Sequence, residues 1–327
     1  MADRIRKINI DKNTVHAVVT TDGSVLPTNA QLYGLAVSAE GTVYATDYAN
    51  SVVYKVFEDG RANGAVVGKI AVTGDIASSG GPSGLDGTNN GNTARLNKPV
   101  GIAVDASGNI YIADKLNHKI KRLSPSGRCQ TLAGTGVTGD AVNDNGLLAQ
   151  FASPEGICVD KAGIVYVADT DNNKIKKIYP SGKTVVLAGA GDASSGMVNG
   201  NGNTAKFDAP TAVCADQNGM LYVADSVNYR IRQVDEAGNV VTLAGFANGS
   251  VDGVGNAARF GSVFDICIDN SGVIWVLDFG NATIRRVLNN GKVTTFLGWK
   301  GNTTGGASAI AVDKSGFLYI LEKNVAL

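Results

Sequence analysis

Side chains that could bind a ligand gather in four loop segments of this 327-residue chain. Three of these segments, 86–96, 199–207 and 252–260, are rich in Gly and Asn and end in Ala, a basic residue and Leu or Phe. A looser copy spans 144–151. Because loops on a rigid scaffold carry recognition, we expect the amide and carboxylate groups here to contact a polar ligand or a protein. The candidate ligand-binding residues are Asn89, Asn92, Asp144, Asn145, Asn201, Asn203, Asp252 and Asn256.

Clustered Asp, Asn and carbonyl oxygens are also ligands that Ca²⁺ accepts. None of the four segments has the alternating acids and closing Glu of a calcium-binding loop, so the sequence predicts no metal and no other cofactor. We expect instead that each Gly/Asn turn leads into a short helical turn over Ala-Arg-Phe. The Phe or Leu would then pack the loop against the next strand.

Cysteine and histidine do not form a metal or nucleophile pattern. The cysteines Cys129, Cys158, Cys214 and Cys267 are separated by 29, 56 and 53 residues, and the chain has two histidines. Structural zinc requires closely spaced ligand pairs, which this spacing does not provide. The sequence therefore predicts neither a zinc site nor a disulfide framework.

An internal repeat defines the elements that must position these residues. Six segments share a pattern close to Gly-Ile-Ala-Val-Asp-x-x-Gly, and they begin at Leu32, Pro99, Pro154, Pro210, Val263 and Ala307. The acid of each copy (Ser38 in the first) marks intervals of 67, 55, 56, 53 and 44 residues, and counting round the termini adds 52. Because these intervals account for the whole chain, we predict a single domain spanning 1–327.

Each repeat contains four short, apolar and β-branched segments divided by Gly, Asn and Asp turns, which is typical of an antiparallel meander. One meander cannot bury both of its faces, whereas six around a channel can. The sequence therefore predicts an all-β fold, a six-bladed β-propeller of four-stranded antiparallel blades. The predicted blades span 32–78, 99–134, 154–189, 210–245, 263–298, and 307–327 completed by 3–20.

The two termini are predicted to share the last blade. The sixth copy stops after two strands, while residues 3–8 match the third-strand pattern of residues 118–123. Residues 16–19 would supply the fourth strand. Pairing of the N- and C-terminal strands would close the ring and leave no open sheet edge.

Gly-Ile-Ala-Val-Asp, followed by Gly-x-Ile-Tyr-Ile-Ala-Asp and Asn-His-Lys-Ile, resembles the NHL-repeat family of six-bladed β-propellers. The best matches are residues 101–123, 156–178 and 213–234. The resemblance implies the fold and leaves the function open, because NHL repeats occur in RNA-binding and protein-binding modules and in related lyases and lactonases.

The repeat separates architectural residues from candidate functional ones, because a residue type that recurs in most blades is expected to serve the fold. The acids that end the second strands recur in all six copies and face basic third strands, so we expect them to pair within the blades. Cys158, Cys214 and Cys267 share one first-strand position and are expected to be small buried side chains. His118 occupies a repeated position and is expected to be structural. The recurring acids are Asp47, Asp114, Asp169, Asp225, Asp278 and Glu322.

Two acids, Glu155 and Asp265, break the repeat near the starts of first strands, where side chains could approach the channel mouth. A lactonase-like or lyase-like enzyme would need a metal or an acid/base cluster there. No third ligand can be named beside these two acids, so no catalytic residue is assigned.

Lys plus Arg and Asp plus Glu both number 29, so the formal net charge is zero. This balance disfavours nucleic acid as the partner, and no apolar run is long enough for membrane insertion. We therefore expect a non-catalytic binding or scaffolding propeller that recognises a protein or polar ligand through inter-blade loops on one face. A component of a larger assembly, such as a phage particle, fits this expectation.

The alternative is a metal-dependent enzyme resembling the propeller lactonases or lyases, and an RNA-binding module is favoured less. Residues 1–8 are charged and lack the apolar stretch of a secretory signal. The expected location is the cytoplasm or a particle assembled there.

Overall fold

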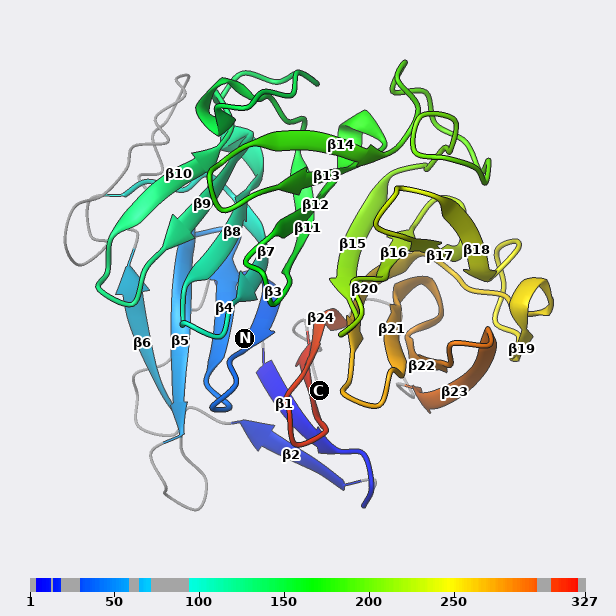
Figure 1. The fold of residues 1–327 in the computed structure, drawn as a ribbon. Helices are drawn as coiled ribbons and strands as arrows, with labels where there is room; N and C mark the ends of the chain where they lie inside the picture. The colour runs from blue at the N-terminus through cyan, green and yellow to red at the C-terminus, as the bar shows by residue number, and fades with distance from the viewer. Residues whose placement is uncertain are drawn as a thin grey trace.

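The computed structural model describes residues 4–12, 14–18, 30–58, 65–71, 94–298 and 307–322. These residues form six antiparallel sheets, each with four main strands, arranged around a central channel (Figure 1). The predicted six-bladed β-propeller is confirmed. Among the described residues, regular helix is limited to five three-residue 3₁₀ turns, and no helix is long and apolar enough to cross a membrane.

The strands can be grouped by their position in the blade. The first strands are β3 (Leu32–Val37), β7 (Pro99–Val104), β11 (Pro154–Val159), β15 (Pro210–Ala215), β20 (Val263–Ile268) and β24 (Ala307–Val312). The second strands are β4 (Val43–Asp47), β8 (Ile110–Asp114), β12 (Val165–Asp169), β16 (Leu221–Asp225), β21 (Ile274–Asp278) and β25 (Phe317–Glu322).

The third strands are β5 (Val52–Glu58), β9 (Lys119–Leu123), β13 (Lys174–Ile178), β17 (Arg230–Val234), β22 (Thr283–Val287) and β1 (Arg4–Asn9). The fourth strands are β6 (Ala65–Ala71), β10 (Cys129–Ala133), β14 (Thr184–Ala188), β18 (Val240–Ala244), β23 (Lys292–Gly298) and β2 (Thr14–Val18). A short extra strand, β19 (Gly253–Val254), pairs with β23. The 3₁₀ turns are η1 (Lys115–Asn117), η2 (Gly146–Leu148), η3 (Thr170–Asn172), η4 (Gly255–Ala257) and η5 (Phe279–Asn281).

The turn between first and second strands explains the repeated Asp-x-x-Gly pattern. In the second repeat, the Asp105 carboxylate accepts hydrogen bonds from the backbone N–H groups of Ser107 and Asn109. Gly108 adopts a φ of 79°, which glycine reaches at the lowest cost. Gly41, Gly163, Gly219, Gly272 and Gly316 hold the same left-handed conformation in the other copies.

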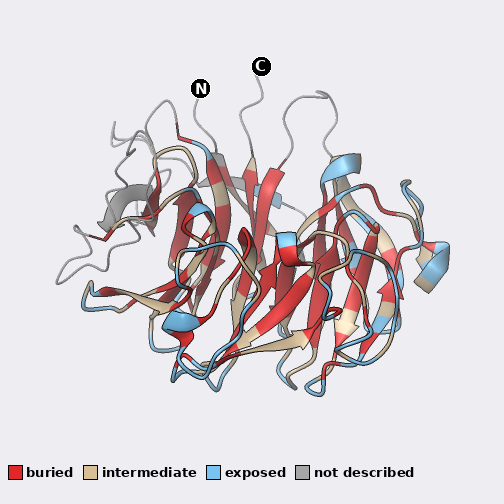
Figure 2. Cartoon of the chain, turned by 90° about the horizontal axis from the view of Figure 1, so that it is seen from above, coloured by how far each residue is buried: buried red, intermediate tan, exposed pale blue. Residues whose placement is uncertain are grey.

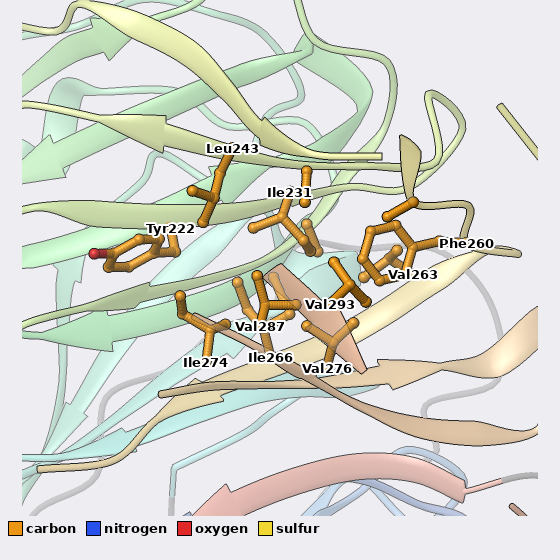
Figure 3. Packing of buried hydrophobic residues seen from close by; sticks show 14 of the residues in the cluster. Tyr222, Ile231, Leu243, Phe260, Val263, Ile266, Ile274, Val276, Val287 and Val293 are labelled. Carbon is orange, nitrogen blue, oxygen red and sulfur yellow. The ribbon is translucent and has the colours of Figure 1, made fainter. Parts of the chain in front are cut away.

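Hydrophobic side chains fill the space between neighbouring blades. The first strands contact one another in the ring order β3, β7, β11, β15, β20 and β24, and β24 contacts β3 again. Figure 3 shows one such layer, in which Tyr222 and Ile231 of one blade meet Ile274 and Val287 of the next, with Phe260 packed among them. Burying each sheet against two neighbours stabilises blades that could not fold alone.

The N-terminal and C-terminal strands share one blade, as predicted. β1 pairs antiparallel with β25, with Ile8 opposite Leu318, and β2 continues the sheet on the other side of β1. Ile5 packs into the hydrophobic cluster shared with the blade of β3, and Ile8 packs into the cluster shared with the blade of β20. A strand from the N-terminus thus joins the last blade to both of its neighbours.

Candidate binding surface and channel mouth

Each blade has two ends. First and second strands are joined by tight hairpins at one end, and third and fourth strands are joined there as well in the blades of β7, β11, β15 and β20. At the other end, which we call the entrance end, the first strand begins and, except in the blade that the termini share, the second strand turns into the third. Figure 2 shows buried strands between two exposed edges. The inter-blade loops, defined as 134–153, 189–209 and 245–262, leave from the entrance end.

The sequence led us to expect these loops on one face of the ring. The structure shows that they do not stay on that face. Gly200 pairs with Val240 at the start of β18, and β19 pairs with β23. The carbonyl of Asn143 accepts a hydrogen bond from the N–H of Thr184 in β14. The loops therefore run down the outer rim (β19 lies at the margin in Figure 1) and cover fourth-strand edges whose hydrogen-bonding groups would otherwise be unpaired.

A buried ion pair attaches each of these loops to the following blade. Arg232 of β17 donates to the Asp225 carboxylate at 2.7 Å, and both side chains are fully buried. The same guanidinium donates to the backbone carbonyls of Lys206 and Val198 in the preceding loop. It also stacks over Phe207, with its carbon 5.3 Å from the ring centroid. One arginine thus joins the second strand, the loop and the loop's aromatic anchor.

The same clamp recurs in two neighbouring blades. Arg285 pairs with Asp278 at 2.9 Å and lies over Phe260, while Lys176 pairs with Asp169 at 2.8 Å and lies over Phe151. Desolvation by burial raises the pKa of the three aspartates Asp169, Asp225 and Asp278, and the cations oppose this increase. The expected pairing between second-strand acids and third-strand bases is therefore found within these blades.

The expected helical turn lies three residues earlier in the loop than predicted. The 3₁₀ turn η4 covers Gly255–Ala257, and Ala258 is already extended with ψ of 153°. In the looser copy, η2 covers Gly146–Leu148 and likewise ends before Phe151. The extended backbone allows the Phe to insert between blades, where Phe151, Phe207 and Phe260 are completely buried.

Several of the polar residues that were predicted to bind a ligand instead form hydrogen bonds that stabilise the loops. Asp252 accepts hydrogen bonds from Arg285 and from the backbone and hydroxyl of Thr295. Although partial burial raises the pKa of Asp252, the bonds from Thr295 and Arg285 outweigh it and lower the value. Asn145 accepts from the N–H of Leu147, and Asn201 accepts from Thr204.

The remaining polar candidates are exposed or lie outside the described part of the chain. Asp144 forms a solvent-exposed ion pair with Lys183 at 2.9 Å. Asn203 and Asn256 are exposed on their loops. Asn89 and Asn92 lie outside the described residues.

Apolar residues, which the sequence analysis did not select, project from the same loops. Among the described residues, nine of the fourteen exposed large hydrophobic side chains belong to the three inter-blade loops. Three more lie in the turns between second and third strands at the entrance end. The nine loop residues are Val137, Val142, Leu147, Leu148, Met197, Val198, Phe246, Val251 and Val254.

The two acids that break the repeat belong to a set of polar bridges between adjacent blades. Lys115 donates to Glu155 at 2.5 Å, and Asp265 accepts from the N–H of Ile310 at 2.9 Å. At the four other junctions a hydroxyl donates to a carbonyl, as Thr46 to Val100, Thr170 to Pro210, Thr211 to Val263 and Ser308 to Leu32. Glu155 and Asp265 therefore complete this set at two of the six junctions.

Asp265 also lines the channel, which has a volume of about 300 Å³. Burial raises its pKa to about 7, against the opposing effect of the N–H groups of Ile310 and Ile266. Cys158, Cys214 and Cys267 line the same channel, and burial raises the pKa of all three thiols. Among the described residues, no group of three or more His, Cys, Asp or Glu side chains is arranged to hold a metal ion.

His118 lies in the left-handed turn after η1, with φ of 51°, and its Nδ1 accepts a hydrogen bond from the N–H of Ser153. Asn173 does the same for Ala209 in the next blade. This shared geometry agrees with the expected structural role of His118. Its imidazole joins one blade to the entry of the next.

The closed ring of six four-stranded sheets defines this chain as a six-bladed β-propeller. Comparison with protein-family models matches the NHL repeat over residues 96–123 and the teneurin NHL domain over residues 125–235. NHL repeat-containing protein 2 from Bos taurus is 33% identical over 183 residues, which cover 52% of this chain and 24% of that protein. Residues 96–123 and 125–235 of this chain are therefore similar to NHL-repeat β-propellers. The chain spans less than a quarter of the length of the curated relatives that it matches first.

Solved structures show how widely this architecture is shared. A virginiamycin B lyase from Staphylococcus aureus matches with a TM-score of 0.59 at 15% identity, covering 98% of this chain and 88% of the lyase. A gluconolactonase from Xanthomonas campestris matches with a TM-score of 0.60 at 15% identity, covering 98% of this chain and 95% of that one. At this identity the likeness concerns the fold alone.

Proposed function

We propose that this propeller is a non-catalytic binding module that recognises a protein partner through its inter-blade loops. The observation that carries the proposal is the concentration of exposed apolar side chains on these loops. Leu147, Leu148, Met197 and Phe246 are each more than half exposed. Exposed apolar side chains that gather on neighbouring loops are what a protein partner would bury on binding.

The rigidity of the loops supports the same function. Buried arginine or lysine clamps and buried Phe anchors fix each loop to two blades, as described for Arg232 and Phe207. A loop that is already ordered loses little conformational entropy when a partner binds. The polar candidate residues then contribute by shaping the loops, as Asp252 and Asn145 do.

The hydrogen bonds of Glu155 and Asp265 also support a binding role over a lactonase-like or lyase-like reaction. Glu155 is paired with Lys115, and both carboxylate oxygens of Asp265 accept backbone hydrogen bonds. A general acid or base has to exchange protons with a substrate, and the two backbone hydrogen bonds occupy both carboxylate oxygens that Asp265 would use.

The test is affinity capture from the source organism with matched variants of the full chain. Wild type should retain a discrete partner that a Leu147→Ser, Leu148→Ser, Met197→Ser variant loses. Val15→Ser should retain it, because Val15 is 50% exposed on β2, away from these loops. Equal capture by the loop variant would contradict the proposal. So would a stoichiometric divalent ion that is lost in Asp265→Ala and accompanied by lactone hydrolysis.

A further inference from the structure

The channel mouth is where the six blades differ most. The second residue of each first strand lies at the entrance end, and the six residues there are Tyr33, Val100, Glu155, Thr211, Phe264 and Ser308. The residue directly after the second strand varies in the same way: Tyr48, Lys115, Thr170, Ser226 and Phe279 in the described copies. Positions that serve the architecture, such as the second-strand acids, repeat instead. The fold therefore does not dictate the chemistry of the mouth.

Four aromatic residues form a continuous wall along one side of this mouth. The ring centroids of Tyr48 and Tyr33 are 4.9 Å apart, those of Tyr33 and Phe264 are 6.1 Å apart, and those of Phe264 and Phe279 are 5.7 Å apart. Adjacent rings are tilted by 34°, 57° and 40°, so the wall is curved. Phe279 is 45% exposed and the other three rings are partly exposed. We call these four residues the aromatic wall.

The opposite side of the mouth is polar. The wall is centred on β24, because Tyr33 and Phe264 lie on the two first strands that flank it, β3 and β20. In the ring order, β11 is the strand opposite β24, and it carries Glu155 in its ion pair with Lys115. Lys98 lies over the ring of Tyr48, 4.9 Å from the centroid, and ends the wall on that side.

We propose that the channel mouth binds a neutral sugar ring, with its apolar face on the aromatic wall and its hydroxyls toward the Lys115–Glu155 pair. A pyranose has a flat face of C–H bonds, which suits the electron-rich faces of aromatic rings. Its neighbouring hydroxyls can donate to Glu155 and accept from Lys115. Because this ion pair is internally neutral, the polar side of the mouth offers an acidic or basic ligand no net charge to bind.

Other cavities of the described chain are weaker candidates for a site. Three lie between neighbouring hairpins at the far end, including one of about 550 Å³ beside Trp275. They recur between different blade pairs, and Trp275 itself is only 2% exposed and already donates to Asp269. Because such cavities recur between blades, we attribute them to the packing of the hairpins and not to a binding site. The mouth has partly or fully exposed rings at positions where the residue type differs between blades.

The experiment is saturation-transfer NMR on the full chain with methyl glycosides of glucose, galactose, mannose and N-acetylglucosamine, and their trisaccharides. At least one neutral sugar should receive saturation on its apolar face. Phe264→Ala and Phe279→Ala should each reduce the affinity for that sugar by about tenfold. Phe246→Ala is the matched control: it removes a 53% exposed ring from an inter-blade loop and should leave sugar binding unchanged. Thermal melts confirm that each variant is folded.

Four results would overturn the site. The first three are that no neutral sugar receives saturation, that the two wall variants bind as well as wild type, and that methyl glucuronide binds as tightly as methyl glucoside. Pentaproline or oligothymidine binding at the wall in place of sugar would also overturn it. The proposal is independent of the protein-binding function, since the Leu147, Leu148, Met197 loop variant should keep the sugar site intact.

Discussion

Arg285 and Arg286 are neighbours in β22 with opposite environments. Arg285 is completely buried against Asp278, whereas Arg286 is exposed. Arg285→Met should reduce the free energy of unfolding by about 3–5 kcal/mol, because it leaves the buried Asp278 carboxylate without its cation and two loop carbonyls without this donor. Arg286→Met should change it by less than about 0.5 kcal/mol. Urea denaturation of the two variants measures the difference, and similar losses from both would refute the clamp.

Asp265 should make stability depend on pH. In the folded chain the pKa of Asp265 is about 7, whereas the pKa of an Asp in the unfolded chain is about 4. Between these values the folded state binds more protons, so the contribution of this residue to stability falls as pH rises through the window. Wild type should lose about 3 kcal/mol relative to Asp265→Asn between about pH 4.5 and 7.5. Parallel pH profiles of the two proteins in denaturant titrations would count against the raised pKa.

At the residue scale, what sequence can predict depends on repetition. The pairing of Asp225 with Arg232 could be predicted, because acid and base recur at fixed positions and a buried charge needs a partner. Asp252 was predicted to bind a ligand because exposed carboxylates on loops often do so. Its bond to Arg285 joins two segments 33 residues apart, and nothing in the local sequence indicates that contact.

Within the inter-blade loops, the buried Phe should determine whether the element is ordered. Phe260 is completely buried between two blades (Figure 3), whereas Phe246 in the same loop is 53% exposed. Phe260→Ala should cost about 3–5 kcal/mol through lost burial and the cavity left behind. Hydrogen exchange should then accelerate over residues 245–262, with much less change in Phe246→Ala. Unchanged exchange in Phe260→Ala would show that the clamp alone holds the loop.

The loops also show how far an element can be predicted. The motif ending in Ala-Arg-Phe correctly predicts an aromatic anchor, because an apolar residue that closes a polar loop needs a place to be buried. The course of the loop along the rim depends on the unpaired edge of the following fourth strand, as Gly200 and Val240 show. That edge exists only once the blades are assembled, so the local pattern predicted a loop on one face.

At the scale of the whole molecule, the fold was predictable and the channel mouth was not. Six copies of one pattern with no residues to spare are sufficient evidence for a closed ring, and the partial copies at the two ends indicate how it closes. The aromatic wall, by contrast, joins Tyr33 and Phe264, which are far apart in the chain and lie on first strands separated by β24. Only the closed ring brings these rings together, so local sequence patterns do not identify them.

Ring closure through β1 leads to the last prediction. Ile5 and Ile8 are 5% and 0% exposed, and they pack into different clusters, one shared with each neighbouring blade. Ile8→Ala should therefore cost about 2–5 kcal/mol, and the loss should be felt in hydrogen exchange of β21 and β22 as well as β25. Removing residues 1–9 should destabilise the whole ring, because β2 would lose its partner and β25 would lose one of its two partners. Lys12→Ala, at an exposed position three residues after the end of β1, is the control and should melt like wild type. If the truncated chain also melted like wild type, the N-terminal strand would not be what closes the propeller.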